Sequence, residues 1–187
     1  CQAGRMTVLP MFPLGSVLFP AMPTALRVFE ERYIVMLSTI LGDEPPEFGI
    51  VLIERGSEVG GGEHRFPIGT VAQITRVETS EGFIWLDDDP YPRAEVRAVD
   101  ELEWDEDRHR ALLERAEQLV RRTISRASEF VEQQWPADIE LSDDPVQACW
   151  QLVGIAPLGA LDQVRLLRAG TVVELLSALI EATEGAA

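Results

Sequence analysis

The pattern of apolar residues changes near residue 100, and this change constrains the fold more than any other feature of the chain. Residues 6–100 contain many prolines and glycines between short β-branched runs, which is typical of short strands joined by turns. Residues 101–187 contain few such breakers and repeat their apolar residues at spacings of three and four, as amphipathic helices do. The sequence therefore predicts an α+β protein, with a β-rich subdomain over 6–100 and a helical bundle over 101–187.

Two segments of the first half show the strand signals most clearly. In residues 24–29, Leu26 and Val28 alternate with Ala25, Arg27 and Phe29, as the two faces of a strand require. Residues 48–54 form a near-continuous apolar run, which indicates a strand covered on both faces. Together with weaker patterns, these segments predict a small mixed barrel with one early helix over 30–41 and strands over 8–12, 24–29, 48–54, 69–79, 83–86 and 93–99.

The second half begins with the longest helical pattern of the chain, over residues 106–135. Asp105 precedes this pattern as a candidate cap, and Pro136 ends it. Three shorter helices are expected after it, beginning at Asp144-Pro145, near Asp162 and at Thr171. The expected core of the long helix is Leu112, Leu113, Ala116, Leu119, Val120, Thr123, Ile124, Ala127, Phe130, Val131 and Trp135.

The charged residues exclude several functions. The chain has 16 basic residues against 32 acidic ones, a formal net charge of −16, and every basic residue is an arginine. A chain without lysine cannot form the Gly-Lys-Ser/Thr phosphate loop of ATPases, a Schiff base or a Ser-Lys protease dyad. The negative charge argues against nucleic acid and membranes as partners, and no apolar run approaches the ~18–20 residues of a membrane span. The two cysteines, Cys1 and Cys149, form no disulfide framework, which favours a cytoplasmic protein.

The residue types used in catalysis do not form a recognisable constellation. His64 and His109 have no metal-ligand spacing with Cys149, and no Gly-x-Ser-x-Gly motif is present. We expect His109 to be exposed among the charges of its helix, and Cys149 to be a buried, inert thiol. Asp87–Asp89 lacks the spaced acids and turn glycine of a calcium loop, so a solvated bend is favoured over a cation site. The sequence thus predicts no catalytic residue, metal or cofactor.

At this point the order of the motifs resembles a known family, the N-terminal (substrate-binding) domain of Lon protease. The resemblance begins in residues 9–33, where Leu-Pro-Met-Phe-Pro-Leu leads to Phe-Glu-Glu-Arg-Tyr, and it extends over essentially the whole chain. Because several ordered motifs agree, the match is more specific than any one of them. The other matching segments are Phe48–Ile53, Ile68–Ile74, Asp89–Val96 and Leu161–Leu167.

The resemblance implies a PUA-like barrel followed by a helical bundle, and a role in binding unfolded or tagged polypeptides. The chain looks like a stand-alone member without the ATPase and peptidase domains, which suggests a non-catalytic adaptor or regulator in protein quality control, with a protease or chaperone as a further partner. PUA-like barrels of other families bind RNA, so an RNA-binding or small-ligand module is the alternative. The family pattern also has a strand pair of about a dozen residues that is missing between Gly82 and Asp87 here.

Two features are candidate contact surfaces. Pro13–Pro23 places apolar residues among four prolines, which obstruct regular strand pairing. Most of these side chains should fill the core, but we predict that Leu14, Phe19 and Met22 form a hydrophobic peptide-binding surface. Arg121-Arg122 can contact an anion, although the polar face of an amphipathic helix explains this pair as well.

Overall fold

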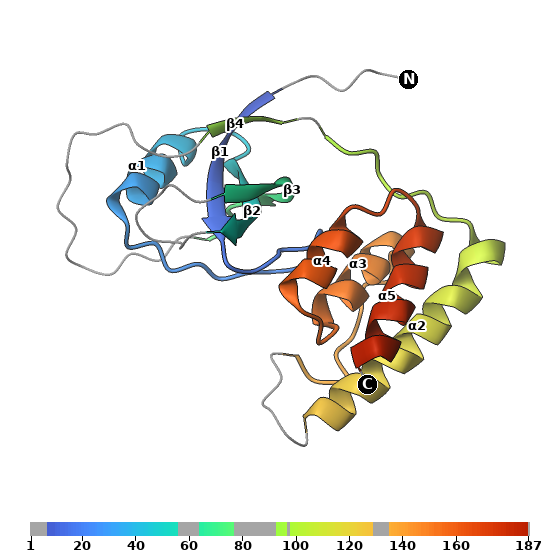
Figure 1. Cartoon of the computed structure of the whole chain (residues 1–187). Coiled ribbons are helices and arrows are strands. Elements are labelled where there is room, and N and C mark those ends of the chain that lie inside the picture. The colour runs from blue at the N-terminus through green and yellow to red at the C-terminus, as the bar shows by residue number, and fades with distance from the viewer. Residues whose placement is uncertain (1–6, 56–63, 77–92, 97, 129–134, 187) are drawn as a thin grey trace. The chain divides into compact units, whose positions relative to one another are not determined.

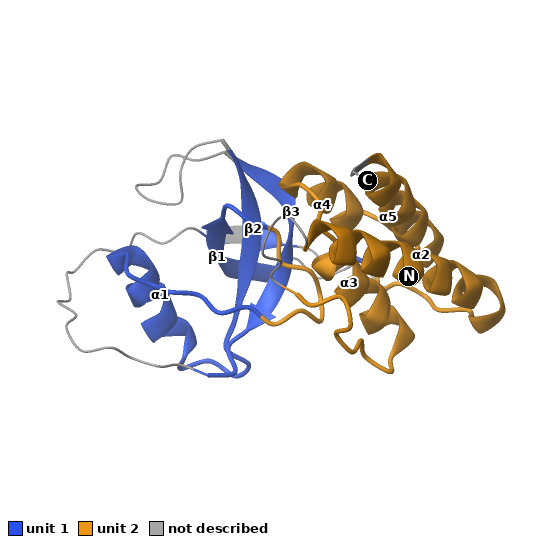
Figure 2. Ribbon diagram, turned by 90° about the horizontal axis from the view of Figure 1, so that it is seen from below, with its two compact units in different colours: residues 1–16, 24–99 blue, residues 17–23, 100–187 orange. Residues whose placement is uncertain are grey.

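The computed structural model describes residues 7–55, 64–76, 93–96, 98–128 and 135–186. The chain divides into two compact units, coloured separately in Figure 2. Unit 1 comprises Cys1–Ser16 and Thr24–Val99, and unit 2 comprises Val17–Pro23 and Asp100–Ala187. A short segment of the first half of the chain therefore belongs with the helices of the second half.

Unit 1 contains a four-stranded mixed sheet in the order β3-β2-β1-β4 (Figure 1). The strands are β1 (Thr7–Leu14), β2 (Glu47–Arg55), β3 (His64–Gln73) and β4 (Arg93–Val96). The first half of β1 pairs antiparallel with β4, and its second half, from Met11, pairs parallel with β2. Strand β1 thereby has a paired strand on each of its two edges. The predicted α+β class is confirmed.

Strand β2 is an inner strand of the sheet, because it pairs with β1 on one side and with β3 on the other. Residues 48–52 are all buried, so the continuous apolar run marks a strand covered on both faces, as its sequence indicates. Gly69 of β3 lies opposite Val51, and a Cβ atom at Gly69 would clash with the carbonyl oxygen of Ile50. A side chain is therefore excluded at this point of the β2–β3 pairing.

Helix α1 (Glu31–Ile40) connects the parallel strands β1 and β2, which need a crossover between them. Its buried residues, Tyr33, Met36 and Ile40, recur at spacings of three and four and form one apolar face. The Tyr33 ring lies 4.2 Å from the ring of Phe12 on β1, measured between centroids. This contact packs the first turn of α1 against the sheet.

Two strand predictions differ from the structure of unit 1. Residues 24–29 show no regular strand, because none of the described strands pairs with them. Strand β3 begins at His64, five residues before its predicted start, and runs to Gln73. The predicted strand over 83–86, the Gly82–Asp87 connection and Asp87–Asp89 lie outside the described residues. Within the described ranges, the four strands of the β-rich unit form a single curled sheet, a half-barrel, which agrees with the predicted fold class.

In the described residues, unit 2 contains four helices, and three of them have an N-terminal signal that is visible in the sequence. Asp105 caps the first by accepting a hydrogen bond from the backbone N–H of Arg108, and Asp144 caps the second in the same way. The last helix follows Thr171, whose Oγ1 accepts a bond from the Glu174 N–H. In the described parts of the chain, no helix is both long and apolar enough to cross a membrane. The helices are α2 (Glu106–Ala127), α3 (Pro145–Ile155), α4 (Ala160–Leu167) and α5 (Val172–Ala186).

The prediction that α2 continues to residue 135 is wrong. The Arg121 guanidinium donates hydrogen bonds to the backbone carbonyls of Ala137 and Ile139. A continuous helix would carry Ala137 about 24 Å along the axis from Arg121, at about 1.5 Å per residue, so these bonds are incompatible with a helix that continues to residue 135. The helix ends at Ala127, and apolar spacing alone does not reveal this end.

The segment 17–23 is bound to unit 2 through contacts with α3. Phe19 is only 2% exposed and its ring stacks on that of Trp150, with 6.2 Å between the centroids. Met22 lies against Gly154, where a Cβ atom would be 2.8 Å from the Met22 Cγ. The amide of Gln151 adds a 3.3 Å hydrogen bond to the carbonyl of Ala21. The segment thus contributes side chains to the interior of unit 2.

Candidate functional site

A cavity of about 200 Å³ with a mainly apolar lining lies in unit 1, where β1 ends and α1 begins. Three parts of the chain surround it: the end of β1, the segment 25–30 and the first turn of α1. Its volume is below the ~300–1,000 Å³ of small-molecule pockets, so it fits a single large side chain better than a metabolite. The lining residues are Phe12, Pro13, Leu14, Ala25, Leu26, Arg27, Val28, Phe29, Glu30 and Tyr33.

The inner part of this cavity is formed by buried aromatic side chains. Phe12 and Tyr33, whose rings are in contact, are 7% and 2% exposed. The Arg32 guanidinium lies 4.5 Å from the centroid of the Tyr33 ring and forms a 3.0 Å ion pair with Glu30. Both the cation–π contact and the ion pair involve residues at the N-terminus of α1, so they stabilise the first turn of this helix.

The outer edge of the cavity is accessible to solvent. Phe29 is 70% exposed and lines the same cavity, whereas Leu14, Leu26 and Val28 are partly exposed. The guanidinium-bearing side chain of Arg27 is exposed beside them. A cavity with apolar walls and an exposed aromatic edge can receive an apolar side chain while the charged groups remain in water.

The three residues predicted for peptide binding fall in different units. Leu14 lines the unit 1 cavity, whereas Phe19 and Met22 belong to unit 2. The expectation that Phe19 is exposed is wrong, since its ring is buried against Trp150. Met22 is partly exposed. A peptide-binding role for this set stays a prediction.

Sequence reasoning missed the contribution of residues 25–29 and Tyr33 to the cavity. The signal was the alternation in 24–29, which places Phe29 on the same side as the polar Arg27. In the structure, Arg27 and Phe29 are indeed exposed, while Leu26 and Val28 are half-buried. An aromatic residue on the polar face of an alternating segment is the feature that points to a contact surface.

The other candidate residues do not form a reactive site in the described residues. Cys149 is fully buried, as expected, and burial raises the pKa of its thiol to about 11. His109 is buried, contrary to expectation, because it lies on the core face of α2, and its Nδ1 accepts a 3.0 Å hydrogen bond from the Asp105 N–H. No group of three potential metal ligands occurs in the part of the chain that the structure describes.

Comparison with known proteins finds one family model that matches the first half of the chain. Residues 8–84 match the family model of the ATP-dependent protease La (LON) substrate-binding domain. This segment includes the residues that line the unit 1 cavity, and it confirms the resemblance to the Lon N-terminal domain over this part of the chain. The site found by geometry thus lies in a segment related to a substrate-binding domain.

Among solved structures, the chain is similar to a Lon N-terminal domain protein from Xanthomonas campestris. The two sequences are 21% identical, and the TM-score is 0.45. The match covers 94% of this chain and 98% of the other. No curated protein sequence matches the chain.

Proposed function

We propose that this chain is a non-catalytic module that binds hydrophobic polypeptide segments in the unit 1 cavity, and that it acts as an adaptor or regulator in cytoplasmic protein quality control. The observation that carries the proposal is an apolar cavity with an exposed aromatic edge inside the segment that matches a substrate-binding family. The cavity volume suits one aromatic or branched aliphatic side chain of an unfolded chain.

The position of Phe29 supports this role. A large apolar side chain that is 70% exposed gains by being covered, and full burial of a Phe side chain contributes roughly 1.5–3 kcal/mol. Covering the exposed part of Phe29 would therefore contribute about 1–2 kcal/mol, a five- to thirtyfold effect on affinity. Because the side chain is already exposed, its removal should leave the fold intact.

The test measures binding of two peptides to the full chain by fluorescence anisotropy. One is a serine-rich host peptide, and the other is the same peptide with a single Phe. We expect the Phe peptide to bind more tightly, and Phe29→Ala to weaken this binding about five- to thirtyfold. Val71→Ala is the matched control, because Val71 is also exposed in unit 1 but does not line the cavity.

Equal binding of the two peptides by the unmodified chain would refute the proposed site. The same conclusion follows if Phe29→Ala and Val71→Ala weaken the binding equally. The adaptor role has one further requirement: addition of the chain must change the rate at which a Lon-family protease degrades an unfolded substrate.

A further inference from the structure

The second half of α2 is a basic region in a strongly acidic chain. Between Gln118 and Ser128 the helix contains Arg121, Arg122 and Arg126 and no acidic residue, whereas its four acids all precede Gln118. Basic residues near a helix C-terminus interact favourably with the helix dipole, which explains why such residues are tolerated there. The dipole alone does not explain how these three arginines differ in their contacts.

The arginines of α2 fall into two groups by their partners. Arg108, Arg110, Arg115 and Arg121 each form an ion pair with a carboxylate, at 3.5, 2.7, 3.5 and 2.8 Å. Within the described ranges, no carboxylate pairs with Arg122 or Arg126. Both side chains are exposed, and the Arg122 Nε donates to the Gln118 carbonyl at 3.1 Å.

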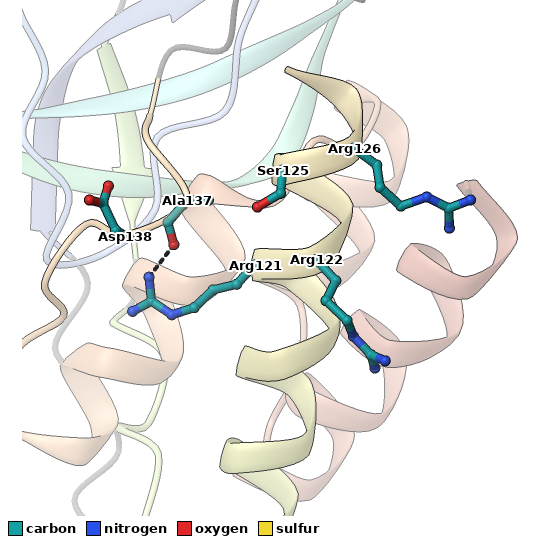
Figure 3. A pocket seen from close by; sticks show the side chains of 6 residues that line it. All are labelled: Arg121, Arg122, Ser125, Arg126, Ala137 and Asp138. Atoms are coloured by element: carbon teal, nitrogen blue, oxygen red, sulfur yellow. Dashed lines mark hydrogen bonds between the residues drawn. The ribbon is translucent and has the colours of Figure 1, made fainter. Parts of the chain in front are cut away.

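These two arginines border a broad hollow of about 670 Å³. On the other side of the hollow, the Arg121 guanidinium donates hydrogen bonds to the carbonyls of Ala137 and Ile139 and thereby holds this segment against α2. Figure 3 shows Arg122 and Arg126 extending from one side of α2, while Arg121 reaches the other way towards Ala137. Ser125, Ala137 and Asp138 complete the lining, and carbon atoms of the lining side chains provide most of its surface.

The spacing of Arg122 and Arg126 fits an extended acidic peptide. Residues four apart in a helix are separated by about 6 Å along its axis. In an extended chain, side chains at alternate positions point the same way and lie about 6.6 Å apart. Two carboxylates in an Asp/Glu-x-Asp/Glu sequence can therefore each meet one guanidinium, the group that binds carboxylates in a bidentate manner.

We propose that Arg122 and Arg126 form a docking site for an extended acidic peptide with carboxylates at alternate positions. The site is in unit 2 and is separate from the hydrophobic site proposed in unit 1. The net charge of −16 repels any anion, and this repulsion grows with the number of ligand charges that extend beyond the two arginines. A short acidic segment can place its few carboxylates on this pair, whereas a continuous phosphate backbone also runs over the acidic surface, so a polypeptide is favoured over a nucleic acid.

The test uses the full chain and three labelled ten-residue peptides, each with a neutral fluorophore. The first repeats Glu-Ser, the second replaces each Glu by Gln, and the third contains the same Glu and Ser residues in two blocks. We expect saturable binding of the alternating Glu-Ser peptide, weaker binding of the block peptide and none of the Gln peptide. Raising the salt concentration should weaken the binding, because the arginines are exposed.

The double substitution Arg122→Gln/Arg126→Gln should lower the affinity for the alternating peptide about five- to tenfold, as expected for two exposed charge pairs. Arg108→Gln is the matched control, since it removes one charge from an 80% exposed side chain of the same helix. Its affinity should stay within about twofold of the unmodified chain. Far-UV circular dichroism checks that α2 is intact in both variants.

Three results would overturn the proposal. One is the absence of saturable binding up to about 1 mM of the alternating peptide. Another is an equal loss of affinity in the Arg108 variant and in the double variant. The third is tighter binding of a single-stranded oligonucleotide of equal charge that also depends on Arg122 and Arg126, which would assign the site to nucleic acid.

Discussion

Replacing Phe19 tests the most consequential difference between the sequence and the structure, namely that this residue fills the interior of unit 2. Phe19→Ala removes a ring that is 2% exposed and stacks on Trp150. Phe→Ala substitutions in protein interiors cost about 3–5 kcal/mol, and the aromatic contact accounts for about 0.5–1.5 kcal/mol of this. The substitution should therefore lower the free energy of unfolding substantially.

One opposing contribution reduces this estimate. Ala21 has a φ angle of 59°, which places it in the left-handed region that costs a non-glycine residue roughly 1–2 kcal/mol. The neighbouring contacts of Phe19 and Met22 hold the segment in this conformation. If loss of the Phe19 ring lets Ala21 relax, the strain is recovered, and the net cost becomes about 1–4 kcal/mol. For a chain of this size, that corresponds to a fall in Tm of roughly 2–16 °C.

Urea unfolding followed by tryptophan fluorescence and far-UV circular dichroism measures this cost. Fluorescence includes the signal of Trp150 beside the substituted ring, one of four tryptophans, and circular dichroism reports mainly on α2–α5, which belong to unit 2. Phe29→Ala is the matched control, because the same atoms are removed from a side chain that is 70% exposed. We expect it to change the free energy of unfolding by less than about 0.5 kcal/mol.

The reasoning would be refuted if Phe19→Ala and Phe29→Ala had the same effect on the free energy of unfolding. A cost below about 0.5 kcal/mol for Phe19→Ala would show that the segment 17–23 does not contribute to the interior of unit 2. The pair also separates folding from binding, because only Phe29→Ala should weaken binding of the Phe-containing peptide without lowering stability.

Two further predictions concern the sheet of unit 1 and the interior of unit 2. Gly69→Ala should abolish cooperative folding of unit 1 or lower its free energy of unfolding by more than about 2 kcal/mol, because the new Cβ meets the Ile50 carbonyl. Gly185→Ala is the control and should not destabilise the chain, because Gly185 has a helical backbone and open space around it. Urea unfolding of both variants checks this. The Cys149 thiol should react with a thiol reagent far more slowly in the native than in the unfolded chain, because burial raises its pKa to about 11. The pKa of the unfolded thiol is about 8.5, so between about pH 8.5 and 11 the native state retains a proton that the unfolded state loses. The free energy of unfolding should therefore fall over this pH range, and Cys149→Ala should lack this part of the pH dependence.

Much of the secondary structure could be predicted because its causes are local. Helix α3 begins where Asp144 precedes Pro145, and Asp144 accepts the expected hydrogen bond from the Gln147 N–H at 2.8 Å. Strand β2 was evident because a strand covered on both faces needs a continuous apolar run. These features depend on neighbouring residues, so a single sequence contains all the information that they need.

The errors have a common cause, which is dependence on residues distant in the sequence. The end of α2 was misplaced because Arg121 binds carbonyls 16 and 18 residues later, which a continuous helix would carry out of its reach. The exposure of His109 was misjudged because its burial depends on the distant helices that pack against that face of α2. Residues 24–29 have the alternation of a strand, but a strand also needs a paired neighbour.

At the candidate sites too, some features could be predicted from the sequence and others depended on distant residues. The sequence by itself determined that this is an acidic, lysine-free α+β chain, and its motifs indicated a resemblance to the Lon substrate-binding domain, whose family model matches residues 8–84. Only the tertiary structure decided that Phe19 packs inside against Trp150 while Phe29 remains in water beside the cavity. The physical reason is that both rings have the same hydrophobicity, and whether one is buried depends on which distant surface folds over it.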